Sequence, residues 1–177
     1  APQIASYFSA YVDLNTGGKA QMGQQIDFAV PTGNFGDILA GWYAKQMGLP
    51  VRKLVCASNR NKVLSDFFKK GVYDVKRNFF RTMSPSMDIL ISSNLERLLY
   101  FTAGAERTAK YMASLNQTGA YTVDADEMSG ETVTEPMEVM AKIRYNHKGA
   151  KAVIEMVGED KLKVTFEEMQ RAITPGQ

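Results

Sequence analysis

The stretch Pro31-Thr32-Gly33-Asn34-Phe35-Gly36-Asp37 decides the fold of this chain, because a short apolar run precedes it and an amphipathic run follows it. Residues 26–30 predict a strand and residues 38–47 a helix. Glycines in such a turn let main-chain N–H groups approach a ligand, and a helix start adds unpaired donors and the positive end of its dipole. The stretch therefore predicts an anion site, and an ordinary strand-to-helix turn is the alternative. Asp37 would repel an anion unless its carboxylate caps the helix and faces away.

Two longer strings carry a family resemblance: PTGNFGDILAGWYAKQMGLPVRKLVCASNRN at 31–61 and SPSMDILISSNLERLL at 84–99. They resemble threonine synthase, and the resemblance covers roughly residues 1–128. That family uses pyridoxal phosphate (PLP) to convert O-phosphohomoserine to threonine and phosphate, so the resemblance implies a lyase of threonine biosynthesis. In the family the GNFG turn holds the cofactor phosphate. The resemblance therefore implies cofactor-binding roles for Gly33, Asn34, Phe35 and Gly36.

A second group of polar residues could line the same cleft. Arginine, with small hydroxyl and amide donors, suits a substrate phosphate. The candidate substrate-binding residues are Ser84, Ser86, Asn94 and Arg97. Arg97 is equally explained as a helix-surface residue beside Glu96. Ser93, three residues before Glu96, matches a capping box and so predicts a structural role.

PLP chemistry needs a lysine amine that bonds to the cofactor, a phosphate anchor and a partner for the pyridine nitrogen. In the family, the lysine lies in a segment upstream of the residues printed here. Lysines such as Lys45, Lys53 and Lys62 do not sit in that motif, and the pyridine-nitrogen partner lies beyond the region of resemblance. We therefore expect no catalytic residue here. The chain is expected to be an inactive fragment that starts partway into a longer parent and retains only the phosphate anchor.

The first part of the chain predicts repeated strand–helix units. Residues 2–14 predict a helix, Val51–Ala57 a second strand, and 59–70 a helix ended by Gly71. Strand–helix units in series imply a parallel arrangement. The expected fold class for 1–128 is a three-layer α/β, parallel-sheet fragment of a PLP-dependent fold type II enzyme. Residues 72–86 predict a solvated basic loop. Two helices are predicted further along the chain, one before Gly104 and one after it.

The pattern changes beyond residue 128. Residues 129–177 alternate apolar and polar side chains and predict a small antiparallel β meander. The strings EPMEVMAKIRYNHKGAKAV and VTFEEMQRAITPGQ resemble the start of the C-terminal β-barrel of tRNA-specific 2-thiouridylase, with Met169 where that family has proline. We expect this meander to dock Val139, Ile143 and Tyr145 on the α/β part, to pair with another chain, or to remain mobile and exchange hydrogens quickly.

The two resemblances leave alternatives for function. One is an RNA-contacting β module of a tRNA-thiolating enzyme, and another is a chimera without activity. Residues 1–128 carry 14 basic and 11 acidic side chains, whereas 129–177 carry 7 and 8. The tail therefore lacks the positive charge of an independent nucleic-acid binder.

The composition excludes several kinds of site and segment. One cysteine, Cys56, excludes an intramolecular disulfide, and one histidine, His147, excludes a His-rich metal site. No apolar run reaches membrane-spanning length. We expect a cytoplasmic protein without metal or membrane partners, whose parent binds O-phosphohomoserine and supplies the missing segments.

Overall fold

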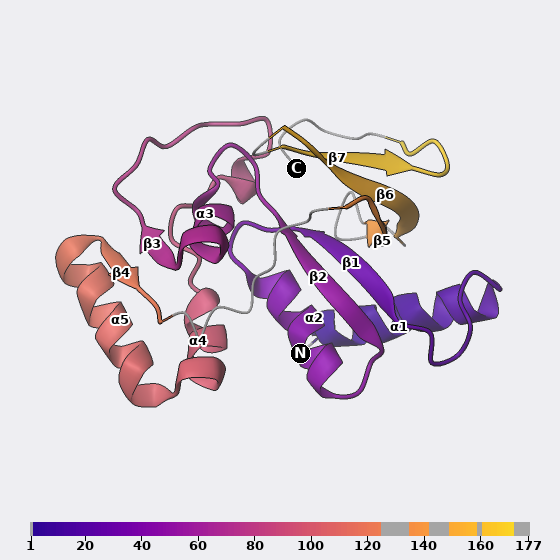
Figure 1. The fold of residues 1–177 in the computed structure, drawn as a ribbon, viewed down its shortest axis with the longest axis horizontal. Coiled ribbons are helices and arrows are strands. Elements are labelled where there is room, and N and C mark those ends of the chain that lie inside the picture. The colour runs from indigo at the N-terminus through magenta and orange to yellow at the C-terminus, as the bar shows by residue number, and fades with distance from the viewer. Residues whose placement is uncertain (1, 125–134, 142–148, 159–160, 172–177) are drawn as a thin grey trace. The chain divides into compact units, whose positions relative to one another are not determined.

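The computed structural model describes residues 2–124, 135–141, 149–158 and 161–171 (Figure 1). They form two compact units, which are described separately. The first contains residues up to Pro31, Asp37–Ala57 and the described residues from 135 to 171. The second contains Thr32–Gly36 and the residues from Ser58 to Asp124.

A five-stranded sheet organises the first unit, in the order β2-β1-β5-β6-β7. Its elements are α1 (Pro2–Thr16), β1 (Ile26–Pro31), α2 (Gly36–Gln46, from Asp37 on), β2 (Val51–Ala57), β5 (Met137–Ala141), β6 (Ala150–Val157) and β7 (Lys161–Phe166). β1 is parallel to β2 and to β5, whereas β5, β6 and β7 are antiparallel to one another. The expected fold class, parallel α/β strands followed by an antiparallel meander, is confirmed.

The two faces of this sheet bury different sets of residues. On one face, Tyr7 of α1 packs its ring edge-to-face on Phe28, and a Cβ at Gly41 of α2 would lie 2.8 Å from the Tyr7 ring. Gly41 is therefore needed for the close packing of the two helices. The core on the other face contains Ala29, Val55, Val139, Ala141, Ala152 and Ile154.

The tail strands complete the sheet that β1 begins. Met140 pairs with Phe28 and Ala141 with Ala29. Val139, Met140 and Ala141 are all buried, because this strand lies between two others and is covered on both faces. Of the three expected outcomes, the described part of the meander shows docking. Ile143, Tyr145 and the division at residue 128 lie outside the described residues, so that division stays a prediction.

The second unit is built around aromatic packing. Its elements are α3 (Val63–Lys70), β3 (Val72–Asp74), the 3-10 turn η1 (Pro85–Met87), α4 (Leu95–Ala103), α5 (Ala105–Thr118) and β4 (Ala120–Thr122). Gly71 ends α3 in a left-handed conformation with a φ of 70°. The basic loop expected over 72–86 begins with a strand, because Tyr73 stacks on Tyr121 and packs edge-to-face on Phe67, and β3 pairs antiparallel with β4.

Placing a charge in the shared core tests whether the tail and β1 form one sheet. Ala152 is 2% exposed, and Ala152→Asp buries a carboxylate there. We expect the free energy of unfolding to fall by more than about 3 kcal/mol, since a buried charge without a partner is costly. Hydrogen exchange should then accelerate in β1 as well as in β6.

Val164→Asp is the control, because Val164 lies on the outer strand and is 41% exposed. It should leave the exchange of β1 unchanged. Loss of protection in β6 with full protection retained at Phe28 would contradict a shared sheet.

Candidate functional site

The turn Thr32–Gly36 is held by the segment that precedes α4. Ser92 Oγ donates to the carbonyl of Gly33 at 2.6 Å, and Asn94 Nδ2 donates to the carbonyl of Asn34 at 3.0 Å. The Asn34 side-chain oxygen accepts from the N–H of Ser93 at 2.8 Å and from its Oγ at 2.9 Å. The carbonyl side of the turn is therefore bound to Ser92–Asn94.

The bound carbonyls determine where the N–H groups of the turn point. In a planar trans peptide the C=O and the N–H point in opposite directions, so Gly33 C=O orients the N–H of Asn34, and Asn34 C=O orients that of Phe35. Among the described residues, no acceptor receives a hydrogen bond from the N–H groups of Gly33, Asn34, Phe35 or Gly36. The turn thus presents consecutive free donors at the start of α2.

Packing explains the residue types in this turn. Phe35 has a φ of 63°, which is unusual for a residue with a side chain, and its ring is 4% exposed and 5.9 Å from that of Phe68. Burial of the ring offsets the backbone strain. A Cβ at Gly33 would lie 3.2 Å from Met87 Cα and 3.2 Å from Ile89 Cδ1, so this position has little room for a side chain.

A polar network around Asp88 fixes the segment that contacts Gly33. Asp88 Oδ1 accepts from Asn59 Nδ2 and Thr82 Oγ1 at 2.8 Å and from Asn61 Nδ2 at 3.2 Å, and Oδ2 accepts from Thr82 N–H at 2.7 Å. The N–H of Thr82, together with these side-chain donors, lowers the pKa of the Asp88 carboxyl. Because Asp88 lies between Met87 and Ile89, its ionised form holds both neighbours of the turn in place.

The structure brings one of the predicted substrate-binding residues to the turn. Asn94 contacts it through the bond to Asn34. Ser84 is buried, its N–H donates to Thr82 Oγ1 at 3.1 Å and its carbonyl accepts from the N–H of Met87 at 2.9 Å. Ser86 and Arg97 are exposed, and within the described residues neither has a side-chain bond to the turn.

Two site residues were missed from the sequence. The run Ser92-Ser93-Asn94 predicts N-cap candidates for a helix, which does not reveal the bond from Ser92 to Gly33. The capping-box prediction for Ser93 is wrong: the N-cap position is Asn94, no side chain caps α4, and Ser93 Oγ donates to Asn34 instead. A capping box is a local signal, whereas these bonds cross 59 positions of the chain. The paired hydroxyls of Ser92 and Ser93 were the available signal.

The donor set fits an anionic group such as the phosphate of PLP. Besides the free N–H groups, Ser58 Oγ is buried without a hydrogen-bond partner in the described part of the chain, and Ser58 directly follows β2 as Thr32 directly follows β1. Ligands of parallel sheets bind outside the carboxyl ends of the strands. Asp37 is the one carboxylate beside the turn in the sequence, and it lies near Tyr7. Burial raises the pKa of Tyr7 most, and the neighbouring Asp37 raises it further.

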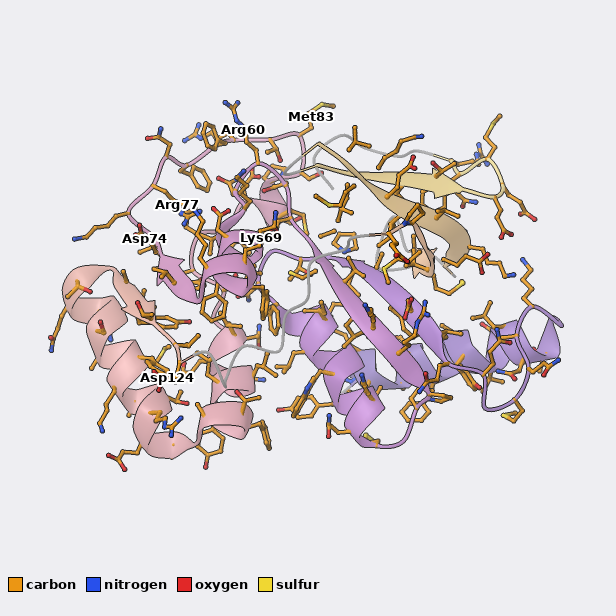
Figure 2. The ribbon with its side chains drawn as sticks, viewed as in Figure 1. Arg60, Lys69, Asp74, Arg77, Met83 and Asp124 are labelled. Carbon is orange, nitrogen blue, oxygen red and sulfur yellow. The ribbon has the colours of Figure 1, made fainter. Side chains whose placement is uncertain are left out.

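The basic segment after β3 is the alternative place for an anion to bind. Its residue Arg77, however, already pairs with groups of the protein. Arg77 Nη1 pairs with Asp66 Oδ2 at 2.6 Å, and Arg77 Nε donates to the carbonyl of Asp74 at 2.8 Å (Figure 2). Arg60 lies 3.9 Å above the ring of Phe80. These contacts indicate that Arg77 and Arg60 stabilise the loop.

Neither a metal site nor a membrane span emerges from the described residues. They contain no cluster of three His, Cys, Asp or Glu side chains suited to a metal ion. None of their helices is long and apolar enough to cross a bilayer.

The relatives of this chain are named threonine synthase or threonine synthase-like. It is 53% identical over 106 residues to threonine synthase-like 1 of Macaca fascicularis, covering 59% of this chain and 14% of that protein. It is 36% identical over 179 residues to the threonine synthase of Methylobacillus glycogenes, covering 94% of this chain and 37% of that one. The chain thus spans a minor part of the length of these relatives.

A solved structure and a family model agree with the two resemblances. The crystal structure of PLP-bound threonine synthase from Brucella melitensis matches 72% of this chain and 27% of that chain, with a TM-score of 0.66 and 43% identity. The family model for an aminomethyltransferase beta-barrel domain matches residues 117–177. The resemblance to threonine synthase, and the β-barrel resemblance of the tail, are confirmed.

Acid should release the Asp88 network. Because the folded pKa of Asp88 is lowered, its ionised form contributes stability that is present above the unfolded pKa of about 4 and lost as pH falls through the folded value. We expect the amide signals of Thr82 and Asn61 to move together in an NMR titration below that pH.

Asp88→Asn should remove this acid transition, because an amide does not titrate in that range. Asp124→Asn, at an exposed carboxylate, should retain it. Thr82 signals that stay constant in the acid range of the wild-type titration would contradict the role given to Asp88.

Proposed function

We propose that this chain supplies the cofactor-phosphate anchor of a PLP-dependent threonine synthase, a lyase that converts O-phosphohomoserine to threonine and phosphate. Gly33, Asn34, Phe35 and Gly36 bind the phosphate through their N–H groups. When bound, PLP supplies an electron sink for the reaction at the amino acid. The residues printed here orient the phosphate end, and the lysine and pyridine-nitrogen partner come from other segments of the parent.

One observation carries this proposal: the carbonyls of Gly33 and Asn34 are bound, while the N–H groups of Gly33–Gly36 have no acceptor among the described residues. A turn that only joined a strand to a helix would have no need of three side chains holding it from a distant segment. Bound carbonyls keep their negative ends away from an anion, and free N–H groups at a helix start attract one. The PLP-bound relative from Brucella melitensis supports phosphate as that anion.

The proposal also includes the candidate substrate-binding residues, which differ in their roles. Asn94 acts on the turn, since its amide already donates to Asn34. Arg97 and Ser86 remain exposed and can contact the phosphate of O-phosphohomoserine. Ser84 shapes the loop beside Met87. A cytoplasmic location, and a small-molecule substrate and the parent segments as partners, accompany this function.

The alternative functions have less support. The β-barrel family match over 117–177 favours an RNA-contacting module, but the tail has no excess of basic residues. The alignment with the Methylobacillus glycogenes protein covers 94% of the chain and so extends past residue 128. That extent argues against a chimera of unrelated parts.

Inorganic phosphate should bind at the turn. In an NMR titration of the 177-residue chain, we expect the amides of Gly33–Gly36 to shift first. Ser92→Ala frees the carbonyl of Gly33 and should weaken phosphate binding by about three- to tenfold, the value of one hydrogen bond.

Ser114→Ala is the matched control, because Ser114 Oγ likewise donates to a backbone carbonyl, that of Ala120, at 2.7 Å. It should leave phosphate binding unchanged. Shifts confined to residues 76–81 would contradict the assignment of the turn.

Added PLP should bond covalently to no particular lysine of this chain. We expect no cofactor absorbance band and, after borohydride treatment, no single modified lysine by mass spectrometry. Stoichiometric labelling of one lysine, for example Lys62, would refute the view that the family's lysine lies outside these residues.

A further inference from the structure

Tyr73 is buried in the second unit and lies far from the turn in the sequence. Its hydroxyl nevertheless forms a hydrogen bond with Ser92, the residue that binds the carbonyl of Gly33. The Tyr73 side chain is 2% exposed. Its hydroxyl donates to the carbonyl of Leu90 at 3.0 Å and accepts from the N–H of Ser92 at 2.8 Å. A single oxygen therefore bridges the two backbone groups on either side of Ile91.

Ser92 passes this constraint to the turn. Ser92 is 5% exposed, its N–H is fixed by Tyr73 and its Oγ donates to Gly33 at 2.6 Å. Because the C=O of Gly33 sets the direction of the N–H of Asn34, a shift of Ser92 rotates that donor. The chain of contacts from hydroxyl to free N–H contains two hydrogen bonds and one rigid peptide.

The ring of Tyr73 is held independently of its hydroxyl. It stacks on Tyr121 with centroids 5.1 Å apart and meets Phe67 edge-to-face at 5.6 Å. Burial raises the pKa of Tyr73, and the bond from Ser92 acts in the opposite direction. The hydroxyl consequently stays protonated at neutral pH and keeps donating to Leu90.

From this geometry we infer that Tyr73 is a positioning residue of the phosphate site: its hydroxyl orients Ser92, which orients the N–H of Asn34, one of the groups that bind the anion. This inference rests on the proposed function for the ligand, but the orientation of the turn can be measured without any ligand. A merely structural tyrosine would lower stability when altered and leave the turn unchanged.

The test compares Tyr73→Phe with Tyr121→Phe in the full 177-residue chain. Both keep the stacked rings, and in the described part of the chain the Tyr121 hydroxyl has no hydrogen bond to Ser92 or to the turn. Without ligand, Tyr73→Phe should shift the amide signals of Ser92 and Asn34 and lower the order parameters of Gly33–Phe35. With inorganic phosphate, Tyr73→Phe should bind about three- to tenfold more weakly than the wild type, and Tyr121→Phe should match the wild type.

The outcomes separate the two claims. Equal turn spectra in both variants overturn the positioning role, whether or not phosphate binds. A wild-type chain that fails to bind phosphate overturns the proposed function, and the spectra without ligand still decide the role of Tyr73. If Tyr73→Phe does not fold, Ser92→Ala, which keeps the Tyr73 bond to the Ser92 N–H and removes the bond to Gly33, must shift the Asn34 amide signal; an unchanged Asn34 signal overturns the inference.

Discussion

The hydrogen bond from Ser92 Oγ to the carbonyl of Gly33 is the constraint on which the site depends. A glycine-bearing turn at a helix start can orient its peptides in several ways, and only some leave the N–H groups free. By binding the carbonyl, Ser92 selects one orientation. Asn94 acts in the same way on the carbonyl of Asn34, and Ser93 holds the side-chain oxygen of Asn34. The neighbouring segment thus holds the turn as a preorganised donor set, which would lower the entropic cost of binding the anion that we propose.

The segment before α4 can orient the turn because its own position is fixed by several contacts. Tyr73 fixes it at Ser92, and the Asp88 network fixes it at Met87 and Ile89, where the backbone approaches Gly33. The strand that precedes the turn in the sequence, β1, belongs to the first unit. β1 lies between β2 and β5 and pairs with both. Its residues Phe28 and Ala29 are buried on opposite faces of the sheet.

Local patterns predicted much of this structure. The strand at Val51–Ala57 follows from an apolar run, and the helix end at Gly71 from a glycine in a left-handed conformation. The turn between β1 and α2 was also predicted, because strand, glycines and helix start are adjacent in the sequence. What could not be predicted are contacts between distant segments. β3 exists because Tyr73 meets Tyr121, and β5 lies beside β1 through a parallel pairing that no turn connects. Ser93 shows the same limit, since a good local capping pattern yields to a bond with Asn34.

A crystal structure of the 177-residue chain grown in phosphate tests the central claim most directly. We predict a phosphate within hydrogen-bond distance, about 3 Å, of the backbone nitrogens of Gly33–Gly36, with the carbonyl of Gly33 turned to Ser92. A phosphate bound at residues 76–81, or a Gly33 carbonyl turned toward the proposed site, would contradict the account.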